Sequence, residues 1–174
     1  MATTEKVKRS LIAHFLDTSD KMGEYSGAKW ARVGKNVTSA AIDFGAQTET
    51  EQDIISSSAT TELTGYQPNM SVSQQCTKGD PVYTFITKKR RARAILADAH
   101  AWMLNVDLWD VTGDGASATY VAEVQEVAIQ LDSYGGDGDA TPTQEFTINY
   151  VGDPIPGTVK ITDGAPVFTA DVAV

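Results

Sequence analysis

Apolar and polar residues alternate along the second half of this chain, and this period of two constrains the fold most strongly. One face of segment 101–110 carries Trp102, Leu104, Val106 and Leu108. Such alternation is typical of a β-strand with one buried face. Segment 120–134 also alternates, but its apolar residues change parity between Val124 and Val127. A β-bulge near Gln125-Glu126 would restore one continuous apolar face, so we predict a long, bent strand there.

Shorter alternating segments predict the remaining strands. They lie at residues 30–35, 37–44, 69–76, 146–150 and 159–168. The last is interrupted by Asp163-Gly164, a dipeptide typical of a tight hairpin turn. Segment 152–157 contains two prolines and is predicted as a stiff turn. Because strands do not alternate with helices, we expect a mostly β protein whose sheet is an antiparallel sandwich or partial barrel.

One packed α-helix is predicted at about residues 80–94. Asp80 is suited to cap its first turn, and Pro81 fits the first helical position. An apolar side formed by Val82, Phe85, Ile86, Ala92 and Leu96 predicts a helix laid over the sheet. The cations at its end, which the helix dipole favours, are Lys88, Lys89, Arg90, Arg91 and Arg93.

Two segments lack a strand or helix pattern of the usual length. Residues 1–28 are polar apart from the cluster Leu11, Ile12, Phe15 and Leu16. They are either a frayed terminus with one apolar anchor or an arm that docks on a neighbouring subunit. Residues 45–68 form a long loop rich in Thr, Ser, Glu and Gln. A loop of this length is usually functional, and the alternation of Thr and Glu predicts a projecting hairpin.

Length and charge limit the classes of protein that fit. The 174 residues favour a single domain over 1–174, and the lone Cys76 excludes an internal disulfide. The net charge is −9, with the acids concentrated in the second half and the cations in the N-terminal segment and the helix. This distribution argues against an extended grip on nucleic-acid phosphates, and it permits pairing between copies of the chain. We expect no membrane span and no signal peptide.

No pattern in the sequence supports catalysis or a cofactor. His14, His100 and Cys76 lack the spacing of a zinc site, and no nucleophile-elbow or phosphate-loop motif occurs. The Asp137/Asp139 loop lacks the ligand pattern of a calcium loop, and such Gly-Asp clusters are usually turns. We therefore expect neither an enzyme nor a cofactor.

Several motifs in order resemble one protein family. They are Trp30–Ser39, Gln47–Glu51, Lys78–Tyr83, Ile129–Gly138 and Phe146–Pro154. Over about residues 8–160 this set resembles the tail tube (major tail) proteins of tailed phages that infect Gram-positive bacteria. The helix departs from that resemblance, because it is unusually basic after Ile86.

The resemblance implies a structural virion protein of the phage tail that is assembled in the host cytoplasm. Its subunits would form stacked hexameric rings around a lumen through which DNA passes without specific binding. Loop 45–68 would reach the adjacent ring through Glu49, Glu51, Asp53, Ile54, Ile55 and Leu63, and the 1–28 arm would join subunits. Further partners would be the tape measure protein and the tail terminator.

A different class remains as the alternative. A monomeric β-sandwich that binds carbohydrate or another surface usually exposes aromatic residues on one sheet face. Trp30, Trp102 and Trp109 lie on separate segments, and the alternation buries Trp102. Glycan binding by a stable monomer would favour this alternative.

Overall fold

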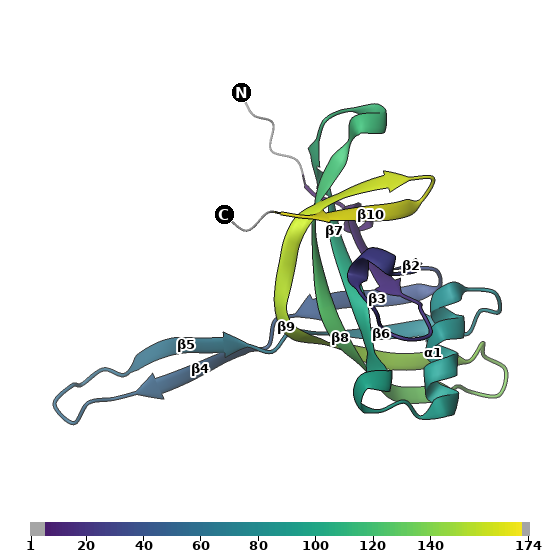
Figure 1. Ribbon diagram of the computed structural model, residues 1–174. Coiled ribbons are helices and arrows are strands. Elements are labelled where there is room, and N and C mark those ends of the chain that lie inside the picture. The colour runs from purple at the N-terminus through teal and green to yellow at the C-terminus, as the bar shows by residue number, and fades with distance from the viewer. Residues whose placement is uncertain (1–5, 172–174) are drawn as a thin grey trace.

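The computed structural model describes residues 6–171 and contains one curled antiparallel sheet, one helix and one projecting hairpin (Figure 1). The sheet has the order β2-β1-β7-β8-β9-β6-β3, and β10 pairs with β9. The curl makes a half-barrel, which confirms the predicted class. The strands are β1 (Ile12–Asp17), β2 (Trp30–Val33), β3 (Val37–Asp43), β4 (Ala46–Glu51), β5 (Thr60–Tyr66), β6 (Asn69–Gln75), β7 (His100–Thr112), β8 (Thr119–Gly135), β9 (Thr143–Thr162) and β10 (Ala165–Ala170).

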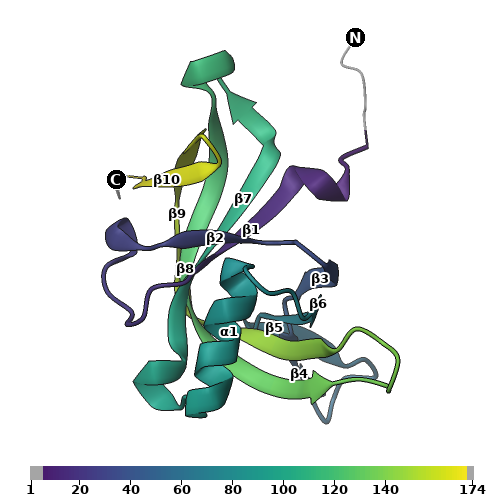
Figure 2. The ribbon, with the colours of Figure 1, turned by 90° about the vertical axis from the view of Figure 1, so that its right-hand side faces the viewer.

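The helix α1 (Pro81–Ala92) covers the open side of the half-barrel (Figure 2). The Asp80 carboxylate accepts a hydrogen bond from the backbone N–H of Tyr83 at 2.8 Å, and Pro81 occupies the first turn. Arg93 ends the helix in the left-handed conformation, with φ of 48°. The predicted helix is therefore confirmed. Its predicted apolar side is wrong at Ala92, the last helical residue, which is exposed, and at Leu96, which is 80% exposed because the helix ends four residues earlier.

Two hydrophobic cores lie on opposite faces of the sheet. The first lies inside the curl and is closed by α1; it includes Leu16, Met70, Phe85, Ile86, Met103, Val127, Phe146 and Ile148. The second lies at the other end of the long strands; it includes Phe15, Leu104, Val106, Val124 and Val159, with Tyr25, Trp102 and Phe168 packed against it. The ring of Tyr25 meets those of Trp102 and Phe168 edge-on at 5.8 Å.

The change of parity along β8 reflects these two cores. The predicted bulge would have brought Val124 and Val127 to one face. Instead β8 stays in register with β7 across this point, pairing Leu104 with Val124 and Ala101 with Val127. Neighbouring positions of opposite parity therefore face opposite sides of the sheet. Val124 packs in one core and Val127 in the other, so the prediction of one continuous apolar face is wrong.

The irregularity at this point belongs to β9. Its pairing with β8 jumps from Ile155 to Val151 while β8 advances only from Val124 to Glu126. The stiff turn predicted at 152–157 is therefore a bulged part of one long strand. Its two prolines are tolerated because β9 exchanges neighbours there: β6 pairs with residues 143–149 and β10 with residues 157–162.

The N-terminal segment also differs from prediction. Residues 1–5 lie outside the described residues, but Ile12–Asp17 is an interior strand between β2 and β7. Phe15 is 4% exposed and Leu16 is fully buried, each in one of the two cores. The interpretation as an arm is wrong for Ile12–Asp17, because apolar residues on both faces of a central strand belong to the chain's own core. Leu11 ends a short 3₁₀ turn just before it.

A buried polar network crosses the sheet beside the first core. His14 Nδ1 lies 2.8 Å from Asn105 Oδ1, which also accepts a hydrogen bond from the Tyr150 hydroxyl at 3.3 Å. The Asn105 amide donates to Glu123. Burial lowers the pKa of His14 below its ordinary value of 6.5, and the bond to Asn105 only partly opposes this.

Stability should therefore fall as the pH drops below 6.5. The unfolded chain takes up a proton on His14 near that pH, while the folded chain resists it until a lower pH is reached. A His14→Gln variant keeps a polar side chain but does not titrate, so its free energy of unfolding should decline less between pH 6.5 and the acid range. Urea titrations at a series of pH values measure this. Equal slopes for the two proteins would contradict the assignment.

Among residues 6–171, no helix is both long and apolar enough to cross a membrane.

Candidate assembly site: the projecting hairpin and the helix groove

The β4–β5 hairpin projects away from the half-barrel as a sheet of its own (Figure 1). This confirms the hairpin predicted for the 45–68 loop. At its base the Gln67 N–H is shared between the carbonyls of Phe44 and Gly45, at 3.1 and 3.2 Å. Gly45 has φ of +54°, and a Cβ there would lie 2.5 Å from the carbonyl oxygen of Gln67. Only glycine fits this approach, so the base of the hairpin is sharply defined.

One face of the hairpin is built from carboxylates. Glu49 stands directly opposite Glu62 in the strand pairing, and Glu51 follows on the same face of β4. All three side chains are exposed, and residues 36–77 contain no Lys or Arg. Like charges directly opposite one another destabilise a two-stranded ribbon. Sequence reasoning missed Glu62, because its position opposite Glu49 follows only from the register.

The other face carries hydroxyl groups and one apolar residue. Thr50 and Thr61 are paired, with 3.0 Å between their hydroxyl oxygens, and Leu63 pairs with Thr48. Leu63 is 53% exposed. The two faces therefore differ in chemistry, and a partner of fixed orientation can tell them apart.

The tip of the hairpin is apolar and unprotected. Ile54 and Ile55 are exposed to 104% and 93%. A turn holds the tip together, with the Ser56 N–H donating to the carbonyl of Asp53 at 3.0 Å. Two adjacent isoleucines held fully in water contribute nothing to the fold of the single chain. Among the large apolar side chains of residues 6–171 they are the two most exposed, which suggests that a partner covers them.

A groove of about 580 Å³ lies where the hairpin leaves the half-barrel. Phe44 and Tyr66 form one wall and meet edge-on with ring centres 6.3 Å apart. Tyr150 and Pro154 form the other, and burial raises the pKa of Tyr150 to about 12. None of these four was predicted as a site residue. The sequence pattern places these four residues at strand ends and turns, which gave no reason to expect a groove there.

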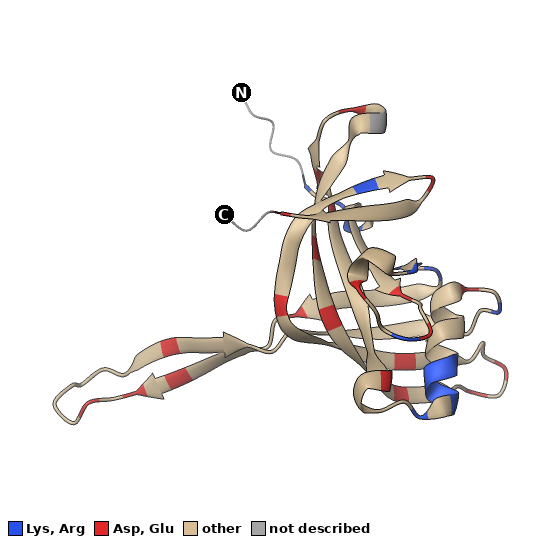
Figure 3. Cartoon of the chain, viewed as in Figure 1, with Lys and Arg blue, Asp and Glu red and all other residues tan. Residues whose placement is uncertain are grey.

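The helix cations are not equivalent. Lys88 pairs with the exposed Asp20 at 2.5 Å, and this contact lowers the pKa of Asp20. Arg90 lies over the ring of Tyr134, 3.8 Å from its centre. Arg91 is exposed, and Arg93 forms the helix end. The exposed cations of the expected basic surface are therefore Lys88, Arg91 and Arg93. Figure 3 shows the Lys and Arg residues of α1 in blue towards the end of the helix.

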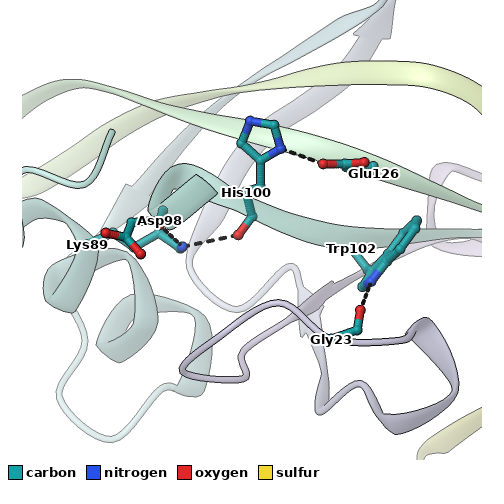
Figure 4. Close-up of polar contacts among 6 residues, drawn as sticks. All are labelled: Gly23, Lys89, Asp98, His100, Trp102 and Glu126. Carbon is teal, nitrogen blue, oxygen red and sulfur yellow. Dashed lines mark hydrogen bonds and ion pairs between the residues drawn. The ribbon is translucent and has the colours of Figure 1, made fainter. Parts of the chain in front are cut away.

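Lys89 is a structural residue and is only 8% exposed. Its Nζ donates to the backbone carbonyls of Asp98 at 2.5 Å and His100 at 3.2 Å, as Figure 4 shows. Burial lowers its pKa, and Asp98 and Asp17 oppose that shift. In the same view His100 contacts Glu126 at 2.5 Å, and the Trp102 indole donates to the Gly23 carbonyl at 2.7 Å. These contacts fix the segment after α1 to the sheet.

The structure brings together no group of three or more His, Cys, Asp or Glu side chains that could hold a metal ion, within the residues it describes. The Asp137/Asp139 loop is a turn between β8 and β9, where the Ala140 N–H donates to the Asp137 carbonyl. The tryptophans form no common platform. Trp30 and Trp102 pack at the second core, while Trp109 is 48% exposed on β7.

A scan of protein-family models gives no match to this sequence, and neither does a search of curated proteins.

Proposed function

We propose that this chain is a structural subunit of a phage tail tube. Copies would form hexameric rings that stack into a hollow tube in the virion tail, and DNA would pass through the lumen. The observation that carries the proposal is the projecting hairpin, which exposes Ile54 and Ile55 fully while its carboxylates find no cation on the same strands. Contact with another molecule would bury the isoleucines and bring cations to the carboxylates, and so would stabilise the hairpin beyond its own strand pairing.

Other features support the proposal. The ordered motifs resemble tail tube proteins, and the half-barrel with one covering helix suits a subunit whose role is mechanical. The net charge of −9 would make a lumen that repels DNA and leaves it mobile. The tape measure protein and the tail terminator would be further partners, within the tube and at its end.

Assembly of the purified full chain tests the proposal. We expect negative-stain microscopy at rising protein concentration to show rings or tubes of uniform width, and light scattering to show a mass far above 18.6 kDa. A protein that stays monomeric at every concentration and salt condition, and that does not enter virion tails when supplied during infection, would refute the proposal.

A further inference from the structure

A second groove of the molecule runs along α1 and carries three cations. It encloses about 820 Å³. Its charged lining residues are Lys78, Lys88 and Arg91, and no Asp or Glu lines it. All three cations are exposed. The Lys88–Asp20 pair is exposed too, and a pair of that kind contributes little, so Lys88 can exchange Asp20 for another carboxylate.

One buried group in this groove is left without a partner. Thr87 is only 9% exposed, and its Oγ1 makes no hydrogen bond within the described part of the chain. Thr87 lines the groove together with Lys88 and Arg91. The chain itself covers this hydroxyl, so the groove offers a partner its three exposed cations rather than Thr87.

We propose that this groove binds the carboxylate face of the β4–β5 hairpin of a second copy. Charge complementarity favours this occupant. Three carboxylates share one face of the hairpin: Glu49, Glu51 and Glu62. Three cations share the groove: Lys78, Lys88 and Arg91. Carboxylates that repel one another across the hairpin would each gain a cation in the groove. The inference rests on the proposed function, because it supplies the receiving surface for the hairpin of a neighbouring subunit.

The two surfaces cannot meet within one molecule. The hairpin extends from one side of the half-barrel and α1 lies on the other, in Figure 1 and again in Figure 2, where α1 faces the viewer and the hairpin lies behind. A strand of seven residues such as β5 spans about 23 Å, so the hairpin reaches well beyond its own domain. Contact between two different patches is heterologous, and it propagates into a ring or a filament.

Nucleic acid is the competing occupant of a basic groove. Five acidic residues and no cation lie between Asn36 and Thr77, and the whole chain carries −9, so its field repels a polyanion at long range. The hairpin of a second copy presents its carboxylates at a fixed spacing, and its concentration equals that of the protein itself. The groove is therefore assigned to the hairpin.

Reciprocal charge reversal tests the assignment. The hairpin variant is E49K/E51K/E62K and the groove variant is K78E/K88E/R91E. Each alone should raise the critical concentration for assembly about tenfold or more, since three favourable pairs become repulsive. A mixture of the two variants should assemble near the wild-type concentration, because reversed hairpins fit reversed grooves. Pelleting and microscopy measure both quantities, and circular dichroism verifies that each variant is folded.

Matched controls change the same charge elsewhere. D110K/D114K/D171K alters exposed carboxylates away from the hairpin, and K6E/K8E/K160E alters exposed cations away from the groove; both should assemble as the wild type does. If the wild type assembles, two results would overturn the groove assignment alone. One is a groove variant that assembles as well as the wild type, and the other is a mixture of the two variants that fails to assemble. A wild-type protein that never assembles would remove the proposed function itself. Binding of a nucleic-acid duplex that the groove variant abolishes, with assembly unchanged, would assign the groove to nucleic acid instead.

Discussion

A variant that lacks Ile54–Leu63 is expected to fold as the full chain does and to lose assembly completely. The deletion removes the tip and most of β5, but it leaves Ala46 opposite Tyr66 and Gln47 opposite Gly65 at the base. Both hydrophobic cores lie in the half-barrel and include no residue of the deleted segment. The free energy of unfolding should therefore change by less than about 1 kcal/mol.

A smaller change separates the apolar tip from the rest of the hairpin. Replacing Ile54 and Ile55 by serine removes two side chains that touch nothing in the single chain. If a neighbour buries them, each contributes about 1.5–3 kcal/mol, so the pair changes the association constant by about 10²- to 10⁴-fold. Sedimentation across a concentration series measures the loss.

The control is V111S/V167S, which removes two apolar side chains that are 49% and 61% exposed on other strands. It should assemble at the wild-type concentration. Tubes formed equally well by I54S/I55S would contradict the role of the tip, and tubes formed by the deletion variant would contradict the role of the whole hairpin. Melting of the deletion variant far below the wild type would show instead that the hairpin supports the fold.

Local patterns in the sequence predicted the elements of this fold well. Asp80 and Pro81 marked the start of the helix, and Asp163-Gly164 marked the last hairpin, where both residues have positive φ. The composition of 45–68 predicted the projecting hairpin. Each of these features depends on residues close together in the sequence, where turn and cap chemistry acts directly.

The errors arose where distant segments decide the structure. Ile12–Asp17 became an interior strand because β2 and β7 pair with it on both sides. The two parities of β8 became two cores because different elements cover the two faces. The carboxylate face and the helix groove also depend on register and packing. Glu62 stands opposite Glu49, and Lys78 lies in one groove with Arg91, only once the chain has folded.

A chain of buried polar groups ties α1 to the sheet, and its loss should give the largest change in stability among polar substitutions. The Gln144 amide donates to Gln74 Oε1 at 3.1 Å, and the Gln74 amide donates to Asp80 Oδ1 at 3.0 Å. The same oxygen accepts the Tyr83 N–H at the start of the helix. All three linked side chains are at most 4% exposed. Asp80 Oδ1 therefore joins β6 to α1 directly, and Gln74 extends the link to β9.

An Asp80→Ala variant should lose about 2–4 kcal/mol of unfolding free energy. Removal of the helix cap costs about 1–2 kcal/mol. Loss of the bond to Asp80, which leaves the Gln74 amide only the longer bond to the Lys35 carbonyl at 3.4 Å, adds about 1–2 kcal/mol. Asp80→Asn keeps an acceptor oxygen at the same place, so it should retain most of that stability. Asp139→Ala removes a carboxylate from an exposed loop and should change stability by less than about 0.5 kcal/mol. Urea denaturation compares the three variants, and a D80A protein as stable as D139A would show that the linkage does not hold the helix. The first turn of α1 also supplies Tyr83 and Thr84 to the groove, so D80A should weaken assembly as well, whereas D80N should not.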